Sequence, residues 1–222
     1  MRRVSASRFP VLHVEGKNDM YVIGGIMREH DLELDAEKGP VIIQSADSVE
    51  QLIENMPIAT KAALGRHEHI GFVLDYDVMA KNRWAQVKEA MKRAGVTLKD
   101  ADVKKSGIIK EVEGARVGIW IMPYPGAKSG KLEDFLRALI PSGNPLLPKA
   151  RAYVADVAKT VPSNERFRDV DKEKAEMYAW LAVQEQPGNP YGTAIRAHAF
   201  KTDQPVAVAF VRWMVDLYGL NR

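Results

Sequence analysis

Short apolar runs alternate with segments of helical periodicity along the first 140 residues of the chain. The runs are rich in β-branched residues and indicate buried strands at 10–14, 41–43, 70–74 and 117–122. Apolar residues at helical spacing follow each run, within 20–27, 49–56, 84–94 and 132–140. Because near-continuous apolar strands separated by helices are typical of covered parallel sheets, the pattern predicts an α/β fold, a mostly parallel sheet flanked by helices.

The pattern changes after a stretch rich in proline, glycine and asparagine at 141–145, which marks a boundary. Beyond it the periodicity indicates only helices, over 171–185 and about 204–218, with a tight turn at 187–192. The charged segment 99–113 is either an edge hairpin or a loop. We therefore expect an α/β domain over residues 1–141 and a helical extension over residues 142–222 that packs on it.

Composition narrows the functional classes. The 222 residues carry a net charge of +3 and include no cysteine. The missing thiols exclude a disulfide scaffold, a cysteine zinc site, a thiol nucleophile and an iron–sulfur cluster, and they fit the reducing cytoplasm, which is the expected location. We expect no membrane span and no signal peptide, because no apolar run approaches about 18 residues.

Acidic residues follow three of the predicted strands. Glu15 ends the first strand and Asp19 lies in the turn of helix that follows it, Asp75 and Asp77 end the third, and Glu133 opens a later helix. Each feature alone also has an ordinary explanation, as a helix-start acid or a polar loop. Since active sites of open α/β sheets lie beyond the carboxyl ends of the strands, the three together predict a site for one or two divalent cations that handles phosphate.

Two lysines accompany these carboxylates. Lys17 and Lys131 each stand at the start of a helix that follows a strand-end motif, and both are candidate phosphate-binding residues. The Asp75 and Asp77 pair leaves a second reading open, a haloacid-dehalogenase-type phosphatase in which Asp75 is the nucleophile. In that class the nucleophile usually ends the first strand of the core, whereas here the pair follows a later strand.

These motifs resemble the TOPRIM domain, which topoisomerases, bacterial primases and OLD-family nucleases share. Its signature is a glutamate followed by glycine after the first strand, here Glu15 and Gly16, and Asp-x-Asp after a later strand, here Asp75 and Asp77. The chain also resembles a small TOPRIM-related family of bacteria and archaea, a domain-of-unknown-function family. The features shared with it are Arg83-Trp84, Met122-Pro123, the segment 130–134 and the late helix 174–182.

The resemblance implies roles for individual residues. Glu15 would be a metal ligand or a general acid/base, and Asp75 and Asp77 would bind Mg²⁺ or Mn²⁺. The OLD-family nucleases add three further counterparts, which are the metal ligands Asp19 and Glu133 and the catalytic lysine Lys174.

The resemblance also implies a function. The chain has no counterpart of the tyrosine-bearing domains of topoisomerases, the zinc-binding parts of primases or an ATPase domain. The resemblance therefore implies a free-standing Mg²⁺-dependent nuclease of DNA or RNA. The implied setting is an effector in an anti-phage defence or toxin-like system with a separate ATPase partner, and a homo-oligomer is compatible with it. The other reading that stays open is a non-catalytic, metal-bound subunit that binds nucleic acid or a partner.

Overall fold

Five strands form one sheet in the part of the chain that the computed structural model describes, which is residues 9–34, 39–76, 83–102, 107–124 and 130–221. The sheet order is β2-β1-β3-β5-β4, and only the β4–β5 pair is antiparallel. The strands are β1 (Val11–Val14), β2 (Ile42–Ser45), β3 (Ile70–Asp75), β4 (Ile108–Val112) and β5 (Ala115–Met122). The predicted mostly parallel sheet is confirmed, and the charged segment before β5 contributes an edge hairpin.

The strand register brings the predicted site residues to one edge. Val14 of β1 lies opposite Val73 of β3, and Asp75 of β3 lies opposite Met122 of β5. Because these three central strands run parallel, their carboxyl ends meet at the same edge of the sheet. Glu15, which directly follows β1, therefore lies beside the end of β3.

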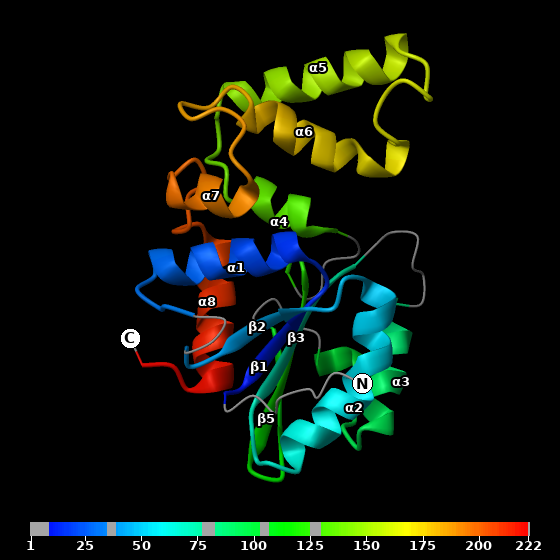
Figure 1. Ribbon diagram of the computed structural model, residues 1–222, viewed down its shortest axis with the longest axis vertical. Helices are drawn as coiled ribbons and strands as arrows, with labels where there is room; N and C mark the ends of the chain where they lie inside the picture. The colour runs from blue at the N-terminus through cyan, green and yellow to red at the C-terminus, as the bar shows by residue number, and fades with distance from the viewer. Residues whose placement is uncertain (1–8, 35–38, 77–82, 103–106, 125–129, 222) are drawn as a thin grey trace, which may run out of the picture.

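Helices cover both faces of the sheet (Figure 1). One face carries α1 (Lys17–Glu29) and α8 (Pro205–Tyr218), and the other carries α2 (Val49–Leu64) and α3 (Arg83–Arg93). The start of α2 is fixed locally, since the Ser48 hydroxyl accepts a hydrogen bond from the Gln51 N–H at 3.2 Å. Each face has its own apolar core, and the sheet separates the two.

The last helix, α8, packs directly on one face of the sheet and is hydrogen-bonded to its strands. The indole of Trp213 donates a hydrogen bond to the Ile108 carbonyl at 3.1 Å, and the Tyr218 hydroxyl donates to the Val11 carbonyl at 2.9 Å. Gly118 on β5 permits the close approach, because a Cβ there would overlap Leu217 and Trp213. The end of the chain thus packs on strands from its beginning and its middle.

Four helices lie beyond the carboxyl edge of the sheet, and α5 and α6 form a hairpin at that end of the molecule (Figure 1). They are α4 (Leu132–Ala138), α5 (Leu146–Thr160), α6 (Lys172–Leu181) and α7 (Tyr191–Arg196). The sequence pattern predicted neither α5 nor α7. Only Ala150 and Val154 of α5 are buried, so the helix has no long apolar stripe in its sequence. The turn predicted at 187–192 was wrong at its end, because α7 begins at Tyr191. None of the helices described is long and apolar enough to cross a membrane.

Candidate active site

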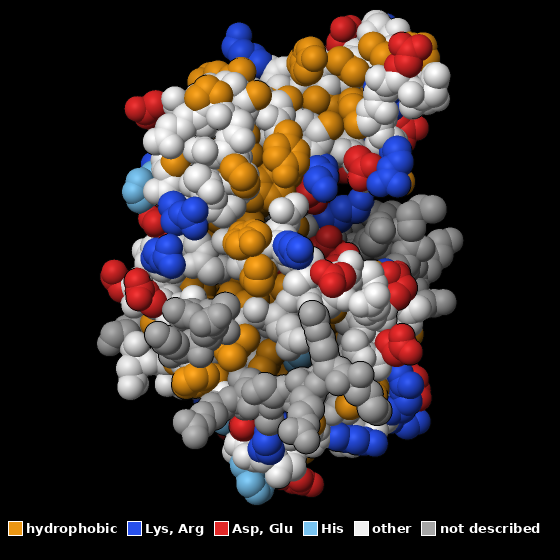
Figure 2. All heavy atoms as spheres, in the orientation of Figure 1, with side chains coloured by type: hydrophobic (Ala, Val, Ile, Leu, Met, Phe, Trp, Pro, Cys, Tyr) orange, Lys and Arg blue, Asp and Glu red, His pale blue; other side chains and the backbone are white. Residues whose placement is uncertain are grey.

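A cavity of about 290 Å³ lies at the carboxyl edge of the sheet, between the strand ends and α6. The predicted site residues that line it are Glu15, Asp75, Lys131, Glu133 and Lys174. Figure 2 shows acidic and basic side chains next to one another where α6 faces this edge. The structure therefore brings together side chains that are up to 159 positions apart, from Glu15 to Lys174.

Asp19 lies just behind the cavity, in the first turn of α1. It is only 7% exposed, and its Oδ2 accepts a hydrogen bond from the Gly16 N–H at 3.0 Å. This bond caps the helix and also holds the carboxylate in place. Burial, and then the negative charge of Glu15, raise the pKa of Asp19 from 3.8 to about 7.

Asp75 ends β3 at the cavity and is half-buried. The Asp75 backbone N–H donates a long hydrogen bond of 3.5 Å to Glu15 Oε2, while the buried Asp75 Oδ1 has no hydrogen-bond partner in the described part of the chain. Burial raises the pKa of Asp75 well above its ordinary value, and the charges of Asp19, Glu15 and Glu133 add to the rise. The charges of Asp19, Glu15 and Glu133 are therefore close enough to Asp75 to disfavour its ionisation.

Glu133 is held by a tyrosine that the sequence did not reveal. The Tyr191 hydroxyl on α7 donates a hydrogen bond to Glu133 Oε1 at 3.4 Å, and the Tyr191 ring stacks on Tyr178 with their centroids 5.0 Å apart. Burial and the charge of Glu133 raise the pKa of Tyr191. No sequence signal identified Tyr191, because it follows a Pro- and Gly-rich turn and is placed only by tertiary packing.

The basic residues have different surroundings. Lys131 directly precedes α4, and its Nζ donates a hydrogen bond to the Val170 carbonyl at 3.0 Å. Lys174 reaches the cavity from α6, and Arg83, which the sequence analysis passed over as a site residue, reaches it from the start of α3. Lys17 is exposed and does not line the cavity.

The residues present fit a hard divalent cation in their chemistry. Among the residues described, no group of three or more His, Asp or Glu is arranged to hold a metal ion as it stands. Asp77, the second carboxylate of the predicted pair, lies outside those residues. Two observations favour a cation. The Asp75 Oδ1 atom has no hydrogen-bond partner among the described residues, and negatively charged side chains surround Asp75. A divalent cation prefers oxygen ligands and reduces the repulsion between carboxylates.

Fold and site together define an α/β protein with a cavity lined by carboxylates and lysines at the carboxyl edge of its sheet. A family model, described as a protein of unknown function (DUF3226), matches residues 10–219, and the chain therefore belongs to that family. No match was found among curated proteins or among solved structures.

Proposed function

We propose that this protein is a phosphodiesterase that uses Mg²⁺ or Mn²⁺ to cleave DNA or RNA. The observation that carries the proposal is the meeting of Glu15, Asp75 and Glu133 in one cavity with Lys131 and Lys174. Carboxylates suit the cation, and lysines suit the phosphate oxygens of the substrate. The resemblance of the strand-end motifs to the TOPRIM domain supports the same reaction and suggests a defence setting with an ATPase partner.

Glu15 and Asp75 are the described residues best placed to hold the cation. The Asp75 Oδ1 atom is buried without a hydrogen-bond partner among the described residues, and Asp19 adds negative charge from behind. A bound divalent cation supplies charge stabilisation at the phosphate and makes an attacking water more acidic. Glu133, which Tyr191 orients, lies on the α4 side of the same cavity and completes the carboxylate set.

The two lysines act on the substrate side of the cavity. Lys131 is oriented by the hydrogen bond that its Nζ donates to the Val170 carbonyl. Lys174 lies in the first turn of α6, four residues after Val170. Both ammonium groups bind non-bridging phosphate oxygens, and their positive charge stabilises the negative charge that builds up during cleavage. This arrangement requires α6, so the helical extension takes part in the reaction.

The test is cleavage of labelled single-stranded and duplex DNA and RNA by the purified full chain. We expect cleavage that depends on Mg²⁺ or Mn²⁺ and that Glu15→Gln and Asp75→Asn both abolish. Glu33→Gln, at an exposed position outside the cavity, is the matched control and should cleave like the wild type. Metal-dependent cleavage that survives both site substitutions would refute the proposal.

Two other results would favour a different function for the protein. Mg²⁺-dependent binding of nucleic acid without cleavage by the wild type would indicate a binding subunit that needs a partner. Hydrolysis of small phosphate esters with a phosphoryl group trapped on Asp75 would indicate a phosphatase instead.

A further inference from the structure

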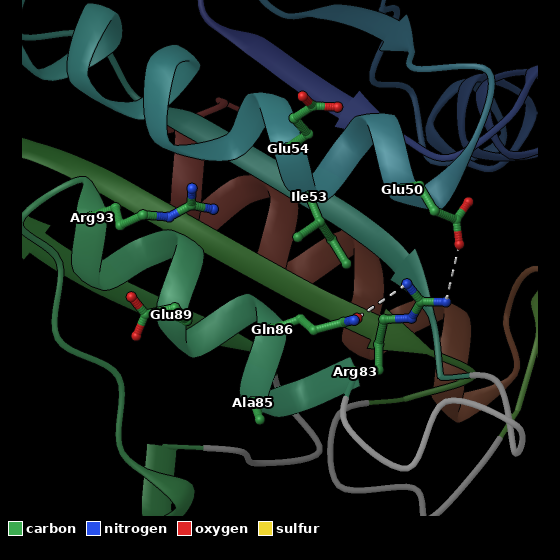
Figure 3. A pocket seen from close by; sticks show the side chains of 8 residues that line it. All are labelled: Glu50, Ile53, Glu54, Arg83, Ala85, Gln86, Glu89 and Arg93. Carbon is green, nitrogen blue, oxygen red and sulfur yellow. Dashed lines mark hydrogen bonds and ion pairs between the residues drawn. The ribbon is translucent and has the colours of Figure 1, made fainter.

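A second and larger hollow, a groove of about 800 Å³, lies between α2 and α3 on the outer side of the sheet (Figure 3). Its volume falls within the roughly 300–1,000 Å³ that is typical of ligand sites. One residue, Arg83, lines both this groove and the acidic cavity. The groove and the acidic cavity are therefore neighbours, and Arg83 belongs to the lining of both.

Arg83 is buried without an adequate partner. Its side chain is 9% exposed, and its Nε has no hydrogen-bond partner in the described segments. Nη1 lies 3.5 Å from Gln86 Oε1, and Nη2 lies 3.8 Å from the carboxylate of Glu50, which is 76% exposed. Since a buried charge is costly unless it is well paired, these long contacts leave the Arg83 guanidinium available to an anion.

The rest of the groove does not suit a chain of phosphates. Apart from Arg83, its charged lining is Glu50, Glu54, Glu89 and Arg93, so acidic side chains outnumber basic ones and disfavour a run of phosphates. Between these acids, Figure 3 shows Ile53 of α2 directed towards Gln86 of α3, next to Arg83. An apolar side chain beside an amide offers a nucleobase a surface for van der Waals contact and a hydrogen-bonding group.

We propose that Arg83 binds a phosphate of a single-stranded nucleic acid and that the groove between α2 and α3 accepts the adjoining nucleobase. The guanidinium fork matches a phosphodiester, and Arg83 lines both the groove and the acidic cavity. In this arrangement one phosphate of the strand binds Arg83 and the nucleobase next to it lies in the groove. The following phosphate of the same strand lies in the acidic cavity. This inference rests on the proposed nuclease function and adds to it the strandedness of the substrate.

The experiment measures binding of a short fluorescent single-stranded oligonucleotide by anisotropy, in Mg²⁺, with all variants made in the Glu15→Gln chain so that the probe stays intact. We expect Arg83→Gln to weaken binding by about 10- to 100-fold, the effect of losing charge-assisted hydrogen bonds. Lys92→Gln is the matched control, because it removes the same charge from an exposed position of α3 outside the groove. Its effect should stay below about twofold, as for an exposed charge.

A second pair of variants covers the case in which Arg83→Gln does not fold. Gln86→Glu alters an exposed side chain, adds a carboxylate beside Arg83 and should weaken binding by about 10-fold or more. Gln186→Glu makes the same change in an exposed loop outside the groove and should leave binding unchanged. A duplex competitor should bind more weakly than the single strand, because its bases would have to leave the stack.

The outcomes separate this inference from the proposed function. If Gln86→Glu and Arg83→Gln bind like their controls while cleavage still requires Glu15, the nuclease stands and the groove site is overturned. Equal loss in Arg83→Gln and Lys92→Gln would show a general charge effect and would also overturn it. Duplex binding as tight as single-strand binding would overturn the nucleobase part, and a wild type that neither binds nor cleaves would overturn both proposals.

Discussion

The buried carboxyl group of Asp19 should lower the stability of the metal-free protein as the pH rises towards 7, and Asp19→Asn tests this contribution directly. Asparagine keeps an oxygen that can accept the Gly16 N–H bond, whereas it cannot ionise. The substitution therefore removes the buried charge and retains the helix cap. We expect Asp19→Asn to be more stable than the wild type at pH 8 in the absence of divalent cations.

The magnitude follows from the raised pKa. Well below pH 3.8 the carboxyl is neutral in both states, so it costs nothing. As the pH rises towards 7 the unfolded chain loses this proton while the folded protein keeps it, and stability falls; above 7 the full cost is present. The difference between 3.8 and about 7 corresponds to about 4 kcal/mol, or about 8 to 16 °C in the melting temperature.

The assay is thermal unfolding of both proteins at pH 4 and pH 8 in EDTA. The gain from Asp19→Asn should be large at pH 8 and small at pH 4, and Mg²⁺ should stabilise the wild type more than the variant. Asp134→Asn is the matched control, since Asp134 caps α4 as Asp19 caps α1 but is paired with Arg137 at 2.6 Å. A destabilised Asp19→Asn at pH 8, or an equal gain at both pH values, would refute the reasoning.

Three further substitutions test the attachment of α6, the attachment of α8 and the positioning of Glu133. Asn144→Ala should cost about 1 to 3 kcal/mol in urea unfolding, because Asn144 Oδ1 accepts bonds from the Trp180 indole and two N–H groups of α5; an unchanged midpoint would contradict this. Gly118→Ala should cost about 1 to 3 kcal/mol in the same assay by pushing α8 from the sheet, and wild-type stability would show that α8 yields freely. Tyr191→Phe should raise the Mg²⁺ concentration needed for half-maximal cleavage by releasing Glu133, whereas an unchanged metal dependence would exclude the positioning role.

The sheet was predictable because its strands are buried on both faces. Ile70 to Leu74 is a continuous apolar run, and every residue of it is buried in the structure. Parallel strands bring their carboxyl ends together, so the position of Glu15 beside Asp75 follows from the strand order once the strands are known. The carboxylates of the site could thus be proposed before any coordinates.

Other parts of the site depend on tertiary packing that no local pattern encodes. Arg83 opens an ordinary amphipathic helix, and only the meeting of α2, α3 and the strand ends buries its guanidinium. Tyr191 reaches Glu133 across 58 positions. Lys17 is adjacent to the motif in sequence, but it lies at an exposed position at the start of α1 and does not line the cavity, so its contact with phosphate stays a prediction.

The helical extension is as much a part of the site as the sheet is. The boundary at residue 141 separates two patterns of secondary structure, yet one apolar core contains Leu12 and Trp120 from one side of it and Phe210 from the other. The cavity is shared in the same way, because Lys174 and Glu15 both line it. A lysine on a helix beyond the sheet can act on a phosphate at the strand ends only if that helix is held in place. Burial of Met177, Trp180 and Leu181 holds α6 in the core. Salt bridges from Glu176 of α6 to Arg137 of α4 and Arg151 of α5, at 3.3 and 3.4 Å, add to these contacts.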